Sequence, residues 1–204
     1  MGRNNYLNKY NHRAMLKQTD SLKNNTKPIQ ISRRIVSLGI LTLPFTANAF
    51  ANSARRKTQR ELSFYHTHTG DRLSIVYHDG ESHISPALHK INQFLGDFRT
   101  GEIHDIDTRL LDALYLLQQK TGAENNYEVI SGYRSPKTNA KLRSKSGGVA
   151  KRSLHMQGKA IDIRLKGVNT NTLRDTAIAM KIGGVGYYRR SDFIHLDTGR
   201  VRYW

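Results

Sequence analysis

The sequence predicts a small α+β domain in which helices flank a central antiparallel sheet. Several short runs alternate apolar with polar residues or are rich in aromatic and β-branched residues, as strands are, and some lie next to glycine-containing turns. Three longer segments repeat their apolar residues at the spacing of a helix. After an opening hairpin, helices come first and strands dominate later, an order that favours the α+β class with an antiparallel sheet.

The first predicted element is a β-hairpin. Residues 62–68 and 73–77 are rich in aromatic and β-branched residues and flank a turn at 69–71 that contains glycine. His66 and His68 lie two residues apart and would share one strand face, where they could bind a metal together. No acid at regular spacing nearby supports such a site, and exposed strand residues are the better interpretation.

The remaining elements follow from the same two periodicities. The first helix has a proline near its start, and the second begins at an acidic N-cap, Asp107. The predicted elements are helices over 85–95, 107–117 and 171–180, strands over 127–131 and 160–165, and a closing hairpin over 183–188 and 193–197.

The chain is strongly basic, and much of the charge precedes the domain. It has 33 lysine and arginine residues against 16 aspartate and glutamate residues, a formal net charge of +17. Within residues 1–49, a basic stretch precedes a run of 11 apolar or small residues at 35–45 and a small-x-small pattern at 47–49, which together predict a secretory signal. The pair Arg33-Arg34 before the apolar run favours the twin-arginine route, although an ordinary basic segment would look the same.

This signal divides the chain into an export signal over 1–49, a basic flexible leader over 50–60 and a domain over 61–204. The apolar run is too short to cross a bilayer core of about 30 Å at about 1.5 Å per residue. We therefore expect an exported, periplasmic protein with no stable membrane span once the signal is removed.

Composition narrows the chemistry of any site. The chain has no cysteine, which excludes a disulfide scaffold, a thiolate-bound zinc, a cysteine-ligated iron–sulfur cluster and a cysteine nucleophile. A transition metal would therefore be held by histidine and carboxylate. The positive charge alone suggests nucleic acid, but the best basic clusters, at 141–146 and 151–152, lack aromatic residues, and export would separate the protein from nucleic acid.

The strongest candidate site consists of His155, Asp162 and His195. Asp162 stands between two isoleucines of a predicted strand, where a carboxylate is costly unless it is paired or binds a metal. His195 lies in a similar apolar strand, and His155 precedes Asp162 across a turn. Two imidazoles and a carboxylate suit Zn²⁺, with a fourth position left for water. Asp197 would orient a ligand histidine, and Asp192 would accept a proton from the attacking water.

The spacing leaves a structural alternative open. His155 would then be a surface residue of a turn, and Asp162 would pair with a nearby arginine or lysine. Asp192 and Asp197 would be ordinary acids at strand ends.

Several motifs follow one another along most of residues 62–204. They are Ser131-Gly132-Tyr133-Arg134-Ser135, Ser153-x-His155-x-x-Gly158-x-Ala160-x-Asp162, the run Gly-Gly-Val-Gly-Tyr-Tyr at 183–188, and Phe193-x-His195-x-Asp197. Together they resemble the zinc D-alanyl-D-alanine peptidase superfamily. Within it, the murein endopeptidase K branch is the most similar, since it also has a twin-arginine-like signal and an early His-Thr-Gly hairpin.

The resemblance implies one zinc ion and hydrolysis of peptide cross-links in peptidoglycan, with the peptide stems as substrate. The implied zinc ligands are His155, Asp162 and His195. Arg134 would bind a substrate carbonyl or carboxylate and stabilise the oxyanion, since arginine stays charged and offers a fork of donors. Asp192 matches the acid that the superfamily usually has three residues before the last histidine, and Asp197 is the alternative proton acceptor.

Two questions stay open at this point. A related fold could hold zinc structurally, or none, and only bind the cell wall, in which case hydrolysis sensitive to a chelator would be absent. Both D-alanine–diaminopimelate and diaminopimelate–diaminopimelate cross-links fit the resemblance, and the branch favours the latter.

Overall fold

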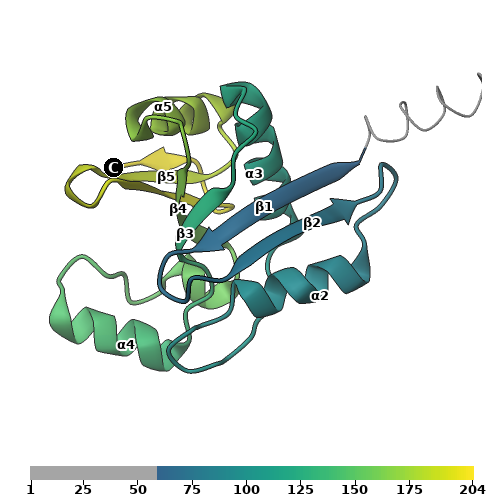
Figure 1. Cartoon of the computed structure of the whole chain (residues 1–204). Helices are drawn as coiled ribbons and strands as arrows, with labels where there is room; N and C mark the ends of the chain where they lie inside the picture. Colours follow the sequence, from purple (N-terminus) through teal and green to yellow (C-terminus); the bar gives the residue numbers. More distant parts are fainter. Residues whose placement is uncertain (1–58) are drawn as a thin grey trace, which may run out of the picture. The chain divides into compact units, whose positions relative to one another are not determined.

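The structure, a computed structural model, describes residues 59–204 (Figure 1). The predicted export signal over 1–49 and most of the predicted leader lie outside the described residues. The elements are, in chain order, β1 (Arg60–His66), β2 (Arg72–His78), α2 (Ser85–Phe94), α3 (Thr108–Thr121), β3 (Tyr127–Ser131), α4 (Pro136–Lys145), the 3-10 helix η1 (Leu154–Gln157), β4 (Ala160–Leu165), α5 (Thr170–Met180), β5 (Gly184–Tyr188), the 3-10 helix η2 (Arg189–Ser191), β6 (Phe193–Asp197) and β7 (Arg202–Tyr203). No helix in this part of the chain is long and apolar enough to cross a membrane.

The α+β class is confirmed, but the sheet is mixed and not antiparallel throughout. Its strand order is β2-β1-β3-β4-β6-β5-β7. β1 pairs in parallel with β3, and β5 with β7, while the other neighbours are antiparallel. Parallel neighbouring strands need a crossover connection. Between β1 and β3 this connection contains β2, α2 and α3, and between β5 and β7 it contains η2 and β6. The sequence pattern identifies strands but not their partners.

The central strands have one apolar face, which packs against α3 and α5 (Figure 1). On β4, Ile161, Ile163 and Leu165 are buried in the core, and on β6 Ile194 and Leu196 are buried there too. Because successive strand residues point to opposite faces, the residues between them lie on the other side of the sheet. That second face carries the polar side chains of the site.

α4 is a helix that the apolar pattern does not predict. The Ser135 side chain accepts a hydrogen bond from the backbone N–H of Thr138, and Pro136 occupies the first turn, so the start signals of a helix are present. Only Thr138 and Asn139 are buried on it. α4 therefore lacks the apolar stripe by which the other helices are recognised.

His66 corrects the prediction that both hairpin histidines are exposed. It is 2% exposed, because it continues the buried side of β1 and lies against the rings of Phe94 and Phe98. His68 lies beyond the end of the strand and is exposed, as expected.

Candidate active site

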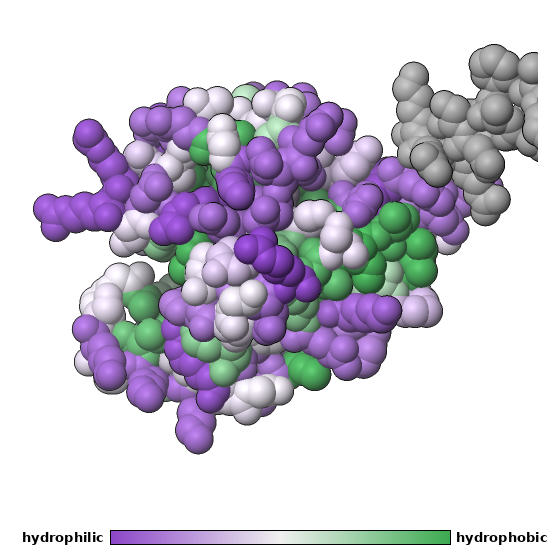
Figure 2. All heavy atoms as spheres, in the orientation of Figure 1, coloured by the Kyte–Doolittle hydropathy of each residue, from purple (hydrophilic) through white to green (hydrophobic). Residues whose placement is uncertain are grey.

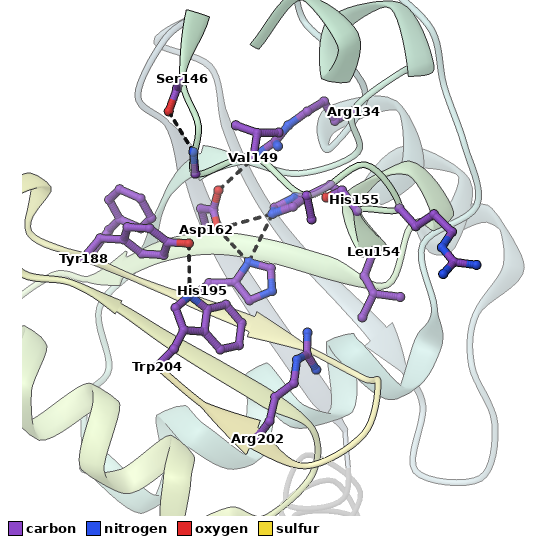
Figure 3. A pocket seen from close by; sticks show the side chains of 15 residues that line it. Arg134, Ser146, Val149, Leu154, His155, Asp162, Tyr188, His195, Arg202 and Trp204 are labelled. Carbon is purple, nitrogen blue, oxygen red and sulfur yellow. Dashed lines mark hydrogen bonds and ion pairs between the residues drawn. The ribbon is translucent and has the colours of Figure 1, made fainter. Parts of the chain in front are cut away.

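The three predicted metal ligands meet on one face of the sheet (Figure 3). His155 Nε2 lies 3.3 Å from Asp162 Oδ1, His195 Nδ1 lies 3.0 Å from the same oxygen, and the two nitrogens are 3.2 Å apart. All three residues are buried, so His155 is not the surface residue of the structural alternative. Within residues 59–204 they form the one cluster of histidines and acids close enough to share a metal ion.

The register of the sheet places two of these ligands. Asp162 of β4 stands directly opposite His195 of β6. Both side chains point away from the core, because the flanking isoleucines of Asp162 and the neighbours of His195 point into it. Backbone hydrogen bonds between the two strands therefore set the distance between the carboxylate and this imidazole.

A short 3-10 helix places the third ligand. η1 ends at Gly158, which has a left-handed φ of 64°. A Cβ at this position would lie 2.0 Å from the carbonyl oxygen of Asp105, so glycine is required both by the φ and by the close approach. This tight turn leads the chain from His155 directly into β4, and the His155 imidazole comes to lie beside Asp162.

The outer nitrogen of each histidine has a fixed acceptor. His155 Nδ1 lies 2.7 Å from the carbonyl oxygen of Gly132, and His195 Nε2 lies 2.9 Å from Asp197 Oδ2. A carbonyl and a carboxylate only accept, so the outer nitrogens carry the protons. The inner nitrogens therefore direct lone pairs toward Asp162 Oδ1. When both imidazoles are neutral, two nitrogen lone pairs and a carboxylate oxygen converge, which is a ligand set for a divalent cation.

The charges of the cluster favour the same occupant. Burial alone would raise the pKa of Asp162, but the neighbouring His155 and His195 hold that pKa well below its ordinary value. Burial alone would lower the pKa of His195, but Asp162 and Asp197 raise it. The negative potential that attracts a proton to His195 also attracts a metal cation, which would take the place of that proton.

Asp197 is fully buried, and donors surround its carboxylate. It accepts hydrogen bonds from His195, from two nitrogens of Arg202 at 2.7 and 3.1 Å, and from the backbone N–H groups of Gly184 and Gly199. Burial alone would raise the pKa of Asp197, but these hydrogen bonds hold it well below its ordinary value. Asp197 thus orients His195 and does not line the cavity described below.

Arg134 lies beside the cluster and points toward it (Figure 3), with its Nη2 3.5 Å from Asp162 Oδ2. Burial lowers the pKa of this guanidinium while Asp162 raises it, and the group stays charged. The turn that carries Arg134 depends on Gly132, where a Cβ would lie 2.4 Å from the carbonyl oxygen of Leu95. The same turn presents the Gly132 carbonyl to His155.

The cluster and Arg134 line an open cavity of about 470 Å³. One wall of it is aromatic: the rings of Tyr188 and Phe193 stack at 4.6 Å, and Trp204 Nε1 donates to the Tyr188 hydroxyl at 3.2 Å (Figure 3). The Trp204 ring lies 5.3 Å from the His195 ring. Sequence reasoning missed Trp204, although it is the only tryptophan of the chain.

Comparison with known proteins identifies the family of the chain. A family model described as peptidoglycan L,D-endopeptidase MepK matches residues 54–204. The chain belongs to this family. The peptidoglycan L,D-endopeptidase MepK of Escherichia coli strain K12 is 42% identical over 169 residues, which are 83% of this chain and 91% of that protein. The probable peptidoglycan L,D-endopeptidase MepK of Haemophilus influenzae is 41% identical over 170 residues, with 83% and 90% covered.

The family assignment confirms the resemblance read from the motifs. The stretch matched by the MepK family includes the cluster of His155, Asp162 and His195, as well as Arg134 and the aromatic wall. It also includes Arg152 and Arg202, two further cations that line the cavity and that the motifs did not single out.

In this member of the MepK family, the structure does not bring Asp192 to the cluster. Asp192 follows η2 with a left-handed φ of 51°, and its side chain is 68% exposed. Its carboxylate accepts a hydrogen bond from the Thr170 hydroxyl and lies 3.8 Å from the Arg164 guanidinium. Among the described residues, Asp162 is the sole carboxylate that lines the cavity.

Proposed function

We propose that the protein is a zinc-dependent peptidoglycan endopeptidase that cuts the cross-link between two diaminopimelate residues. The convergence of His155 Nε2, His195 Nδ1 and Asp162 Oδ1 in an open cavity is the observation that carries this proposal. The names of the relatives supply peptidoglycan as substrate and L,D as the specificity. Of the two cross-links that the sequence allows, the diaminopimelate–diaminopimelate bond joins an L centre to a D centre.

His155, Asp162 and His195 would hold the zinc ion, since His155 Nε2, His195 Nδ1 and Asp162 Oδ1 converge there. A zinc ion held by these residues would supply Lewis-acid chemistry, which polarises a scissile carbonyl and activates water. The Gly132 carbonyl fixes the proton on His155 Nδ1, and Asp197 fixes the proton on His195 Nε2, so both imidazoles stay in the tautomer that binds a cation. Asp197 is therefore a positioning residue.

Arg134 stabilises the negative charge that develops on the carbonyl oxygen. Its Nη2 lies 3.5 Å from Asp162 Oδ2, and Arg134 lines the cavity, so its guanidinium can face a substrate oxygen bound beside the cluster. A buried cation held in place stabilises an oxyanion without having to reorganise during the reaction.

The proton acceptor stays a prediction. Asp192 can serve only if its side chain leaves Thr170 and turns toward the cavity. Asp197 is engaged by His195, Arg202 and two backbone N–H groups, which supports its orienting role over proton transfer. These two possibilities predict different effects of Asp192→Asn.

The proposal is tested with isolated sacculi and soluble cross-linked muropeptides, analysed by mass spectrometry before and after treatment. The wild-type protein should cut diaminopimelate–diaminopimelate bonds, and a chelator should stop hydrolysis until zinc is restored. His155→Ala and Asp162→Ala should lower the rate by about 10³-fold or more, whereas the control Lys90→Ala, at an exposed position, should not.

Hydrolysis by Asp162→Ala at the wild-type rate would contradict the proposal. Binding of sacculi by the wild-type protein without any hydrolysis would instead favour a non-catalytic cell-wall module.

The proposal includes export to the periplasm. The basic stretch, the apolar run at 35–45 and the cleavage pattern at 47–49 support an export signal over 1–49, followed by a basic leader over 50–60 and a zinc peptidase domain over 61–204. The family match begins at residue 54, after this signal. Mass spectrometry of the protein from a periplasmic fraction should find a new N-terminus near Phe50, and Arg33→Lys/Arg34→Lys should reduce export. An unprocessed protein confined to the cytoplasm would contradict this part.

A further inference from the structure

The net charge of the described domain is concentrated in one segment. Residues 59–204 contain 22 lysine and arginine residues and 15 aspartate and glutamate residues, a net charge of +7. Six of the 22 lie in residues 136–152, which contain no acid, while the other described residues are nearly balanced at 16 against 15. We name residues 136–152, which are α4 and the loop that leads to η1, the cationic arm. Its cations are Lys137, Lys141, Arg143, Lys145, Lys151 and Arg152.

The cations of the arm have no partner of opposite charge. All six are exposed, and none forms an ion pair with any residue from 59 to 204. Lys137, Lys141 and Lys145 follow one another at intervals of four, where like charges repel on a helix surface. Such an arrangement disfavours folding of the helix, and an anionic ligand bound there would offset the repulsion.

Hydrogen bonds, and not an apolar core, hold the arm in place. Asp97 accepts from the backbone N–H of Ser135 at 2.9 Å, at the start of α4. Asn139 Nδ2 donates to the carbonyl oxygen of Ala150 at 3.1 Å, which ties the helix to its own returning loop. Most of the other residues of α4 are exposed and polar, so the helix contributes a surface more than a core.

The cationic arm forms part of the cavity wall. Five residues of its loop line the cavity that holds the metal-binding cluster: Ser146, Gly148, Val149, Ala150 and Arg152. Figure 3 shows Ser146 and Val149 on one side of the cluster and Trp204 on the other. α4 lies apart from α3 and α5 (Figure 1), and hydrophilic side chains dominate the face seen in Figure 2. A polymer whose cross-link enters the cavity therefore passes next to the arm.

We propose that the cationic arm binds the carboxylates of stem peptides that neighbour the one being cut in intact peptidoglycan. This inference rests on the proposed function and adds a contact outside the cavity. A single exposed ion pair contributes little binding energy. Stem carboxylates recur along the polymer, however, so the arm can form several ion pairs at once. Several pairs together raise the effective concentration of cross-links at the cavity. Residues 136–152 contain no aromatic side chain on which a base could stack, which favours the wall polymer over nucleic acid.

The test compares two triple variants that lose the same charge. Lys141→Gln/Arg143→Gln/Lys145→Gln removes three cations of the arm that do not line the cavity, and glutamine preserves helix propensity. The control Lys90→Gln/Lys120→Gln/Lys166→Gln removes three exposed cations elsewhere. Binding to sacculi is measured by co-sedimentation at salt concentrations from low to physiological. The samples are kept cold and contain a chelator, so that hydrolysis does not occur during the measurement. Hydrolysis is measured separately on sacculi and on a soluble muropeptide dimer.

The arm variant should bind sacculi about fivefold to tenfold more weakly at low salt, with a shallower salt dependence, and should cut the soluble dimer within about twofold of the wild-type rate. The control variant should behave like the wild type. A second test converts the carboxylates of the sacculi to neutral amides. The wild-type protein should bind these amidated sacculi no more tightly than the arm variant binds untreated sacculi.

Equal binding of sacculi by the two variants, or binding insensitive to amidation, would overturn the proposal. The wild-type protein could instead bind duplex DNA more tightly than sacculi at physiological salt, with this binding lost in the arm variant. That result would show that the arm binds nucleic acid. If the wild type fails to cut the soluble dimer, the proposed function fails, and the comparison of binding still decides the role of the arm.

Discussion

Asp162 and His195 are directly paired residues of neighbouring antiparallel strands, and their side chains meet at 3.0 Å on the face of the sheet opposite the core. The backbone of β4 and β6 brings these two ligands together, while His155 depends on the short helix η1. Most of the site is thus preorganised by rigid elements, which is the condition for tight and selective metal binding.

Asp197→Asn should weaken zinc binding by about tenfold to 100-fold, because the neutral amide orients His195 less well than the carboxylate does. Competition with a chromophoric chelator measures this affinity, and thermal unfolding of the zinc-loaded protein checks that the fold persists. An unchanged zinc affinity would show that Asp197 does not act through His195.

Arg134→Lys should lower kcat/KM by about 10²–10³-fold at unchanged zinc content, since lysine keeps the charge but not the fork of donors. Hydrolysis of a soluble muropeptide dimer gives the rate, and metal analysis of the same sample gives the zinc content. A variant with full zinc content and near wild-type kcat/KM would remove Arg134 from the chemistry.

Asp192→Asn should retain activity within about fivefold, because the carboxylate contacts Thr170 and lies outside the cavity. The matched control is Asp175→Asn, which alters another exposed acid. A loss of about 10²–10⁴-fold confined to Asp192→Asn would instead identify this residue as the general base.

Asp97 should make the stability of the domain depend on pH in the acid range. It is 2% exposed and accepts from the backbone N–H groups of Ser135 and Arg99. Burial alone would raise the pKa of Asp97, but hydrogen bonds from Thr138, Ser135 and Arg99 hold it below its ordinary value. Such a carboxyl stabilises the fold above its unfolded pKa of about 3.9, and this contribution is lost as pH falls through the lower folded pKa.

Asp97→Asn should therefore lower the free energy of unfolding at pH 7 by about 1–3 kcal/mol. The dependence of stability on pH should also become flatter below about pH 4. Urea denaturation at a series of pH values measures both effects. If the variant and the wild type lose the same stability on acidification, Asp97 does not contribute to the acid sensitivity.

The sequence was most informative where a polar or charged residue interrupts the apolar pattern of a predicted strand. Asp162 and His195 interrupt apolar strands, and a buried charged or polar residue in such a place requires a partner or a metal. The periodicity that predicted those strands allowed both side chains to share one face if the strands were neighbours, and the pairing of β4 with β6 supplies that condition. His155 was a weaker prediction, because its spacing before Asp162 allowed it to reach the same point but equally allowed a surface position in the turn.

Other features were beyond the reach of sequence patterns for physical reasons. α4 has no apolar stripe, and strand pairing such as that of β1 with β3 depends on partners far apart in the chain. Asp192 stands at the expected spacing before His195, but a left-handed residue after η2 turns its carboxylate toward Thr170. His66 is buried by the rings of Phe94 and Phe98, which belong to a different segment.

Gly132 helps to position both His155 and Arg134. Its carbonyl aims His155, and the turn that it begins, pressed against Leu95, sets the place of Arg134. Under the proposed function, a change in this turn would therefore alter transition-state stabilisation and metal binding together. Under the proposed function, new substrate preferences should arise more readily at Tyr188, in the aromatic wall, whose hydroxyl contacts Trp204 and neither the cluster nor Arg134.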